Sequence, residues 1–171
     1  MINPYRIQTL ICLFMLTALS ACGFSPVHSS SSTGPNTAFQ NITIETVETG
    51  NPAVDESGFF LKQRLRDRVG AGQGSHILRI TPELNRAQLG FSGDDIASRN
   101  DLSLTANYEL VDAASGDILD AGSVRSTSSF GTPVDAFGRQ AAQDNATRTI
   151  AQETADRLLA RLARFYASTP N

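Results

Sequence analysis

The sequence has few of the residues from which metal centres and catalytic sites are usually built. Its 171 residues include two cysteines, two histidines and no tryptophan. It contains no H-E-x-x-H motif and no cysteine near His76, and His28 lies in a serine-rich segment, so we expect no metal site and no cofactor. It also lacks the G-x-S-x-G motif of a nucleophilic serine. The sequence therefore contains no recognisable catalytic motif, and a hydrolase built from distant carboxylates is kept as an alternative.

Lysine is almost absent. Lys62 is the only one, so arginine supplies the other 13 of the 14 basic residues, against 17 acidic ones. A nucleic-acid-binding domain normally has a basic face, and we therefore expect no nucleic-acid partner. Arginine suits bidentate contact with phosphate or carboxylate, although a GC-rich coding sequence would give the same bias.

A long apolar run occurs only at the N-terminus. Arg6 precedes the mostly apolar stretch Leu10–Leu19, which is too short to cross a bilayer of about 30 Å. Residues 1–21 therefore have the form of an export signal. Their end, Leu19-Ser20-Ala21-Cys22, resembles a bacterial lipobox, and an ordinary secretory signal is the alternative.

The lipobox resemblance implies that Cys22 is lipidated after cleavage, with diacylglycerol on its thiol and an acyl group such as palmitate on its amino group. Several acyl chains anchor a protein stably, because each buried methylene contributes about 0.8 kcal/mol. Gly23 follows the cysteine, where an aspartate commonly marks inner-membrane retention. The resemblance therefore implies a lipid anchor in the outer membrane, on the periplasmic side.

The mature chain is expected to contain one domain. Residues 22–38 comprise the lipidated cysteine and a serine-rich tether. Residues 39–167 have the length and periodicity of a single domain, and residues 168–171 are expected to be a frayed tail.

Six segments of the domain have regular periodicity. Alternating apolar residues predict four strands and helical spacing predicts two helices. The predicted strands are Asn41–Val47, His76–Arg86, Asp101–Val111 and Ile118–Thr127, and the predicted helices are Val54–Val69 and Asp135–Tyr166. We expect an α+β fold, a β-α-β-β-β-α roll with an antiparallel or mixed four-stranded sheet and two helices packed on one face.

Three positions carry more specific expectations. Pro82 has no N–H to donate, so its strand should lie at a sheet edge or be interrupted there. Gly122 is a candidate β-bulge. The apolar stripe of the last helix is expected to begin at Phe137 and continue to Phe165.

Two segments resemble chemical motifs only weakly. The glycines of GAGQG, residues 70–74, follow a predicted helix, whereas a phosphate-binding loop precedes one. We therefore expect a turn. The pair Asp94-Asp95 lies in the polar segment 90–101, which we expect to be a loop with solvated acidic residues.

Arginines on or beside the strands are the candidate binding residues. A solvated sheet face that carries guanidinium groups could bind a phosphorylated glycolipid head group through charge-assisted hydrogen bonds. Solvated arginines with no ligand are the simpler alternative. The candidates are Arg79, Arg86, Arg99 and Arg125.

The whole pattern resembles one known family, the lipopolysaccharide-assembly lipoproteins called LptE. The resemblance combines the lipobox, the following Gly23-Phe24-Ser25-Pro26, the tether and the order of elements. The nearest stretch is LSLTANYELVDAASGDILDAGSVRSTSSF, residues 102–130, and AAQDNATRTIAQETADRLLARL resembles the family's final helix.

This resemblance implies a non-enzymatic function. Family members plug the outer-membrane β-barrel of lipopolysaccharide export (LptD-like), help it to assemble and help to deliver lipopolysaccharide to the outer leaflet. The implied partners are that barrel, lipopolysaccharide and the membrane, and the four arginines become candidate lipopolysaccharide contacts. An auxiliary lipoprotein of a periplasmic lipid-transport or secretion system is a second alternative.

Overall fold

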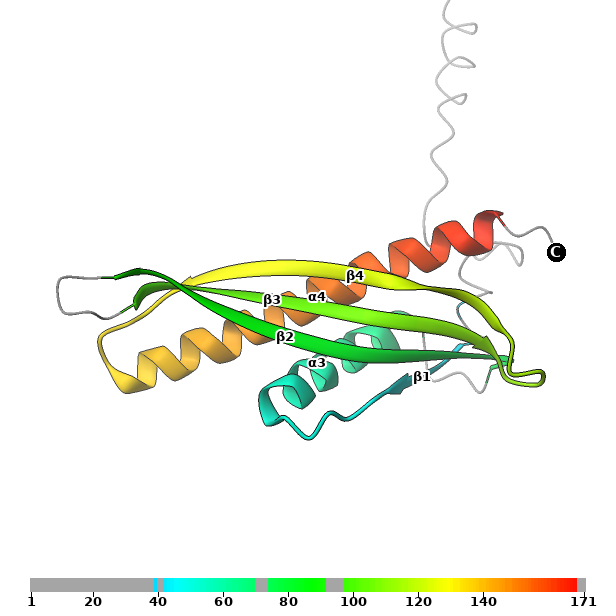
Figure 1. Cartoon of the computed structure of the whole chain (residues 1–171), viewed down its shortest axis with the longest axis horizontal. Helices are drawn as coiled ribbons and strands as arrows, with labels where there is room; N and C mark the ends of the chain where they lie inside the picture. The colour runs from blue at the N-terminus through cyan, green and yellow to red at the C-terminus, as the bar shows by residue number, and fades with distance from the viewer. Residues whose placement is uncertain (1–38, 40–41, 70–73, 92–96, 169–171) are drawn as a thin grey trace, which may run out of the picture. The chain divides into compact units, whose positions relative to one another are not determined.

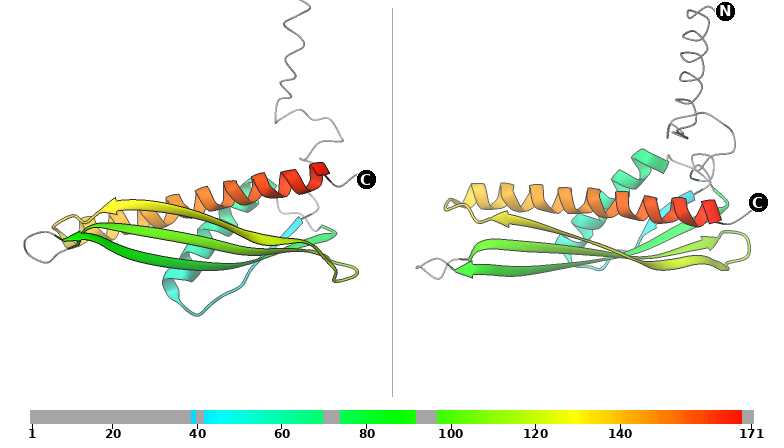
Figure 2. Two further views of the ribbon diagram at one scale, coloured as in Figure 1. Left: turned by 45° about the horizontal axis from the view of Figure 1, so that its top comes forward. Right: turned by 90° about the horizontal axis from the view of Figure 1, so that it is seen from above.

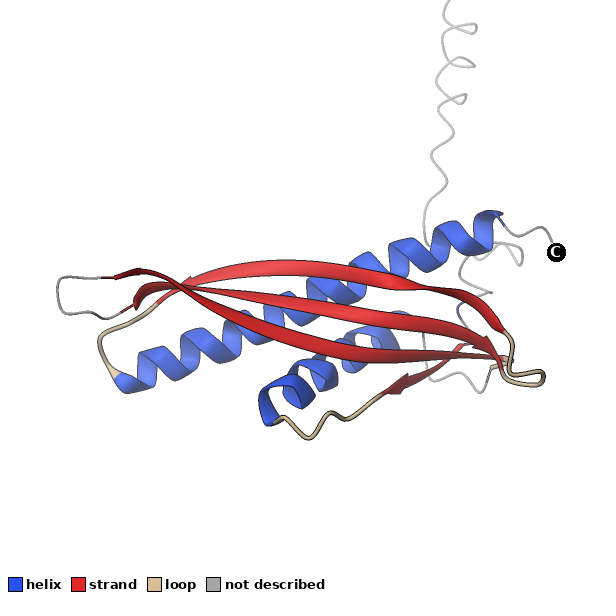
Figure 3. Cartoon of the chain, in the orientation of Figure 1, coloured by secondary structure: helices blue, strands red, loops and turns tan. Residues whose placement is uncertain are grey.

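The computed structural model describes residues 39, 42–69, 74–91 and 97–168, which all belong to the unit Pro35–Asn171. The elements follow the predicted order β-α-β-β-β-α (Figures 1 and 3). The strands are β1 (Ile42–Thr46), β2 (His76–Phe91), β3 (Ala97–Asp112) and β4 (Ile118–Gly131), and the helices are α3 (Pro52–Val69) and α4 (Ala136–Ser168). The α+β prediction is confirmed.

The strands form one mixed sheet in the order β1-β2-β3-β4. β1 is parallel to β2, to which it connects through α3, whereas β2 and β3 and then β3 and β4 are antiparallel. β1 pairs only with His76–Ile80, but β2 continues beside β3 to Phe91. The sheet therefore has four strands at one end and three at the other. The three-stranded end, where β2 and β4 finish and α4 begins, is called the distal end below.

Both helices pack on one face of the sheet, and the opposite face is left uncovered by them (Figure 2). Alternate strand residues point to the helices, as the period of two requires. The core consists of Ile42, Ile44, Leu78, Ile80, Leu102, Leu104, Ala106, Tyr108 and Leu110 from the sheet and Leu61, Leu65, Val69, Ala146, Ile150, Ala151, Ala155, Leu158 and Leu162 from the helices.

β2 and β3 are longer than the sequence predicts. The polar sequence of segment 90–101 predicts a loop, yet β2 pairs with β3 in one continuous register that ends at Phe91 and Ala97. Backbone hydrogen bonds hold this ladder together, so polar side chains do not by themselves end it. The pair Asp94-Asp95 lies outside the described residues.

Pro82 lies on the open side of β2. The carbonyl of Ile80 accepts a hydrogen bond from the N–H of Val47 (2.8 Å), so Ile80 directs its backbone groups toward β1. Since alternate residues of a strand point the same way, Pro82 faces that side too, just beyond the last residue paired with β1. Its missing N–H therefore removes no bond to β3, and the predicted edge position is confirmed for this part of β2.

Gly122 is not a bulge. It pairs directly with Tyr108, and the irregularity of this ladder lies at Leu110 and Val111. A Cβ atom on Gly122 would lie 3.2 Å from the Tyr108 hydroxyl oxygen and 3.3 Å from its Cε1 atom. The glycine allows the aromatic ring to lie against the backbone of β4, and a strand glycine is a sequence signal common to bulges and close approaches.

The buried stripe of α4 starts later than predicted. Phe137 is 88% exposed, and the buried residues begin at Ala146. Helical periodicity identifies residues that share a face, but burial also needs a packing partner. The first turns of α4 border a cavity at the distal end, so the prediction for Phe137 is wrong.

Candidate functional site

A cavity of about 150 Å³ opens at the distal end of the sheet. It lies where the last residues of β2 and the first of β3 meet the exit of β4 and the start of α4. Seven residues line it, none of them acidic: Arg86, Gln88, Asn100, Phe130, Thr132, Arg139 and Gln143. The lining therefore combines two guanidinium groups with amides, a hydroxyl and one aromatic ring.

The two arginines reach the cavity from different elements. Arg86 lies on the helix-facing side of β2, and among the described residues it has no hydrogen-bond or ion-pair partner. Arg139, in the first turn of α4, donates to the backbone carbonyls of Pro133 and Val134. These bonds hold Arg139 at the cavity and leave its charge without a described carboxylate partner. A ligand with phosphate or carboxylate oxygens would suit this pair.

Large apolar side chains are exposed at the same end. Val134 is 98% exposed and Phe137 is 88% exposed, and Leu89 near the end of β2 is 43% exposed. Single exposed apolar residues are common, but three at one end of a domain make that end a candidate interaction surface. The distal end thus offers positive charge and apolar surface together, as an amphiphilic ligand requires.

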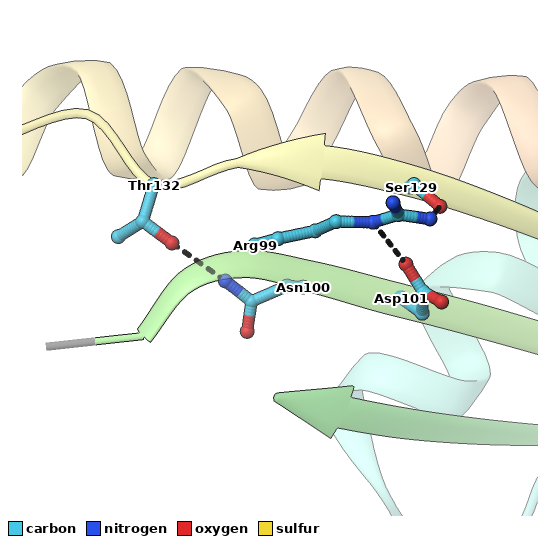
Figure 4. A network of polar contacts seen from close by, with 5 residues as sticks. All are labelled: Arg99, Asn100, Asp101, Ser129 and Thr132. Atoms are coloured by element: carbon cyan, nitrogen blue, oxygen red, sulfur yellow. Dashed lines mark hydrogen bonds and ion pairs between the residues drawn. The ribbon is translucent and has the colours of Figure 1, made fainter. Parts of the chain in front are cut away.

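The connection from β4 to α4 is held by its own side chains. Asp135 caps α4, because its Oδ1 atom accepts a hydrogen bond from the N–H of Gly138 (2.6 Å). A side chain at Gly138 would force its neighbours to shift, since a Cβ atom would lie 2.9 Å from the Cβ atom of Pro133 and 2.8 Å from the Oδ2 atom of Asp135. The amide of Asn100 donates to the Thr132 hydroxyl (2.8 Å), which ties this connection to β3 (Figure 4). The cavity wall is therefore braced from both sides.

On the uncovered sheet face nearby, Arg99 forms a second polar cluster (Figure 4). It donates to the Oδ1 atom of Asp101 (3.2 Å) and to the Ser129 hydroxyl (2.9 Å). The Ser129 hydroxyl, and then Arg99, lower the pKa of Asp101 from its ordinary value. Asp101 thus neutralises Arg99, in contrast to Arg86.

The family model for LptE, described as lipopolysaccharide-assembly, matches residues 39–162. The match spans every element described above except the end of α4. The chain belongs to the LptE family. The resemblance drawn from the sequence is thereby confirmed, and the chain takes part in lipopolysaccharide assembly.

Solved structures show the same fold. A lipoprotein from Caulobacter crescentus has a TM-score of 0.63 and 21% identity, with 80% of this chain and 98% of that chain covered. The rare lipoprotein B from Shewanella oneidensis has a TM-score of 0.53 and 12% identity, covering 74% and 96%. A minor lipoprotein from Acinetobacter baumannii has a TM-score of 0.52 and 15% identity, covering 74% and 92%. A comparison with curated proteins found no match.

In this LptE-family chain the four predicted arginines do not form one cluster. Arg79, Arg99 and Arg125 lie on the uncovered face, but by strand register Arg125 is offset along the strands by roughly 13 Å from Arg79 and by roughly 20 Å from Arg99. Arg79 contacts Glu45 (3.8 Å) and Glu109 (3.6 Å), and Arg125 donates to the Ser103 hydroxyl. Only Arg86 of the four lines the distal cavity.

Arg139 is the site residue that the sequence reasoning missed. The neighbouring segment Pro133–Phe137 could have indicated the site. Its proline and capping aspartate mark the start of a helix, and its two large apolar residues do not continue a regular apolar spacing. Because the helical periodicity places Phe137 in the buried stripe, the sequence predicts a structural role for the first turn of α4.

The other candidate residues either make an ordinary structural contact or lie outside the described residues. Cys22, the tether and His28 lie outside the described residues. The Nδ1 atom of His76 lies 2.9 Å from the hydroxyl of Tyr166 at the end of α4. Among the described segments, no helix combines the length and apolarity needed to cross a membrane.

A second, more polar cavity of about 370 Å³ lies between the two helices. Its charged groups largely have partners within the domain. Arg64 forms an ion pair with Asp156 (3.0 Å), and the guanidinium of Arg148 lies 5.1 Å from the ring centre of Phe60. We regard this groove as part of the helix packing.

Proposed function

We propose that the chain is an outer-membrane lipoprotein that plugs and helps to assemble the lipopolysaccharide-exporting β-barrel, and that its distal end contacts lipopolysaccharide. The family match over residues 39–162 carries the assembly role. The combination of cationic and apolar side chains at the distal end supports the proposed contact with lipopolysaccharide. No step of this function requires catalysis.

The uncovered sheet face supports the role of a plug. Its side chains are short and polar along β3 and β4, and its charges are largely paired within the face. The outward-facing members include Ser103, Thr105, Asn107, Ser123, Thr127 and Ser129. Lumens of outer-membrane barrels are polar, so such a face can lie against one without burying unpaired charge.

The distal end matches the chemistry of lipopolysaccharide. The lipid moiety of lipopolysaccharide combines phosphorylated sugars with acyl chains. A site that binds it therefore needs cationic hydrogen-bond donors beside apolar surface. Arg86 and Arg139 can donate to phosphate oxygens, while Val134 and Phe137 can contact the first methylenes of the acyl chains. We place the main contact there and keep Arg79, Arg99 and Arg125 as candidate contacts on the uncovered face.

The lipid anchor at Cys22 positions the domain at the membrane. β1 begins at Ile42, which pairs with His76, so the tether joins the domain at the end opposite the cavity. From His76 to Gln88 the strand spans roughly 40 Å. A chain anchored at Cys22 can therefore extend its distal end away from the anchoring leaflet. Cys22→Ala should move the protein from the membrane pellet to the soluble fraction, and unchanged sedimentation would contradict the anchor.

Charge reversal tests the contact with lipopolysaccharide. Arg86→Glu/Arg139→Glu should weaken binding of purified lipopolysaccharide at least about tenfold, because each charge-assisted hydrogen bond contributes about 1.5–3 kcal/mol. The loss should be largest at low salt. Binding can be measured by surface plasmon resonance with immobilised lipopolysaccharide.

One matched variant and one variant of the uncovered face interpret the result. Arg66→Glu/Arg164→Glu makes the same change in net charge at exposed helix positions, and it should bind almost as the unaltered chain does. Arg79→Glu/Arg99→Glu/Arg125→Glu tests the uncovered face. If the helix variant binds as weakly as the distal variant, the effect is one of net charge and the distal site is wrong.

A further inference from the structure

The outer edge of β2 is open along its distal half. β1 occupies this edge only beside His76–Ile80, and the last bond across it is the one from Val47 to Ile80. Figure 1 shows β1 next to one end of β2 while the rest of β2 forms the border of the sheet. No described residue pairs with this edge beyond Ile80.

The direction of the unpaired groups follows from the register. Ile80 directs its backbone toward β1, and the pairing of β2 with β3 has no shift through Leu89. Alternate residues therefore direct their N–H and C=O groups outward. Leu84, Arg86 and Gln88 present both groups, whereas Pro82 presents only its carbonyl.

The surroundings of this edge favour a polypeptide as its occupant. Side chains on both faces are mostly polar and exposed, among them Glu83, Asn85 and Gln88, so the edge is unsuited to acyl chains. Outward donors and acceptors repeat every second residue, a spacing that another extended backbone reproduces.

Exposed apolar residues lie where β1 stops. Val47, directly after β1, is 40% exposed, and Phe59 of α3 is 63% exposed. Phe59 follows Gly58, whose position is so close to Pro82 that a Cβ atom would lie 3.2 Å from the Cγ atom of the proline. A strand added beside β2 would extend the line of β1 and could cover these two side chains.

We propose that the edge Leu84–Gln88 of β2 accepts an extended segment of the barrel protein as an additional strand. The inference rests on the proposed barrel partner and names the contact by which that partner is held. The segment would bond through its backbone to three N–H groups and at least three carbonyls of β2. Exposed edges are ready templates for such pairing.

Hydrogen exchange at single-residue resolution tests the pairing. The full chain is compared alone and in its purified complex with the barrel. The amides of Leu84, Arg86 and Gln88 should exchange at least tenfold more slowly in the complex. Those of Glu83, Asn85 and Ala87, which bond to β3, should be slow in both samples.

Each other outcome has a defined meaning. Unchanged exchange at the three outward amides overturns strand addition, and so does an equal slowing of both sets. If the outward amides become protected in the chain alone at high concentration, a second copy occupies the edge and the assigned occupant is wrong. If no complex with a barrel forms at all, the proposed function fails before this inference is reached.

A pair of variants provides an independent test. Leu84→Pro removes one outward N–H, and Leu84→Ala controls for the lost side chain. Both should melt at similar temperatures, but Leu84→Pro should capture about fivefold less barrel. Asn85→Pro removes an N–H that faces β3 and should lower the melting temperature further. Equal capture by both Leu84 variants would overturn the proposal, as would a much lower melting temperature for Leu84→Pro.

Discussion

Tyr108 connects two strands and the last helix through one hydroxyl group. The residue is 2% exposed, and its hydroxyl donates to the Oδ2 atom of Asp120 (2.9 Å) and accepts from the Nε atom of Arg161 (3.1 Å). Burial, and then the bond to Asp120, raise the pKa of this phenol. The ring lies against Gly122, so the position of the network depends on the absence of a side chain there.

Gly122→Ala should destabilise the domain by about 1–3 kcal/mol, the usual cost of overpacking. The new methyl group would displace the Tyr108 ring and lengthen its bonds to Asp120 and Arg161. Urea unfolding followed by circular dichroism measures the loss. Ala121→Ser, at the next and exposed position, should change the free energy of unfolding by no more than about 0.5 kcal/mol. Equal stability of the two variants would show that the ring moves freely.

Tyr166 gives the domain a dependence on alkaline pH. Burial raises its pKa to about 12, whereas an unfolded chain titrates near the ordinary value of about 10. The folded state therefore binds more protons between these values, so the stabilisation is complete below about pH 10 and is lost as the pH rises through about 12.

The matching variant is Tyr166→Phe, which cannot titrate. Its free energy of unfolding should fall less than that of the unaltered chain when the pH is raised from about 9 to about 11.5. The difference between the two proteins isolates this phenol from Tyr108 and the other groups. Parallel curves over this range would mean that Tyr166 has the same pKa folded and unfolded.

At the scale of elements, α4 contains two parts with different roles. Leu158 is fully buried in the centre of the core, whereas Phe137 in the first turns is 88% exposed. Leu158→Ala should cost about 2–5 kcal/mol through lost burial and the cavity it leaves. Phe137→Ser should leave the free energy of unfolding within about 0.5 kcal/mol, and it should weaken lipopolysaccharide binding instead. A large loss of stability for Phe137→Ser would contradict this division of α4.

The helices and strands themselves could be predicted because apolar residues recur with a different period in each. Alternating apolar residues such as Leu102, Leu104 and Ala106 identify a strand with one buried face, and the helices show a separate spacing. The ends of the strands could not be predicted, since backbone pairing continues past the last apolar residue. The exposure of Phe137 was not predictable for a related reason. The helical spacing of apolar residues does not indicate how far the surface that packs against the helix extends.

At the scale of the whole molecule, the candidate site depends on three-dimensional assembly. Sequence periodicity could place Arg79 on the uncovered face and Arg86 on the opposite one. It could not show that β2 reaches the start of α4, where Arg86 meets Arg139, which lies 53 residues later in the chain. The contacts of Arg99 with Asp101 and Ser129 could not be predicted either, because they depend on the strand register.

The described part of the molecule presents three surfaces that differ in chemistry. The uncovered sheet face is polar and largely charge-paired, and the distal end is cationic and apolar. The edge of β2 beyond Ile80 has backbone groups with which no described residue pairs. The proposed plug would use all three, since it would contact the wall of a polar lumen, the lipid cargo and the chain that surrounds it.

Isolation of the tagged lipoprotein from membranes in mild detergent, with its partners identified by mass spectrometry, tests the role of a plug most directly. We predict recovery of a large outer-membrane β-barrel in a one-to-one ratio, together with lipopolysaccharide. Recovery of inner-membrane transport subunits, or of the lipoprotein alone, would contradict the plug and favour an auxiliary role in another lipid-transport system.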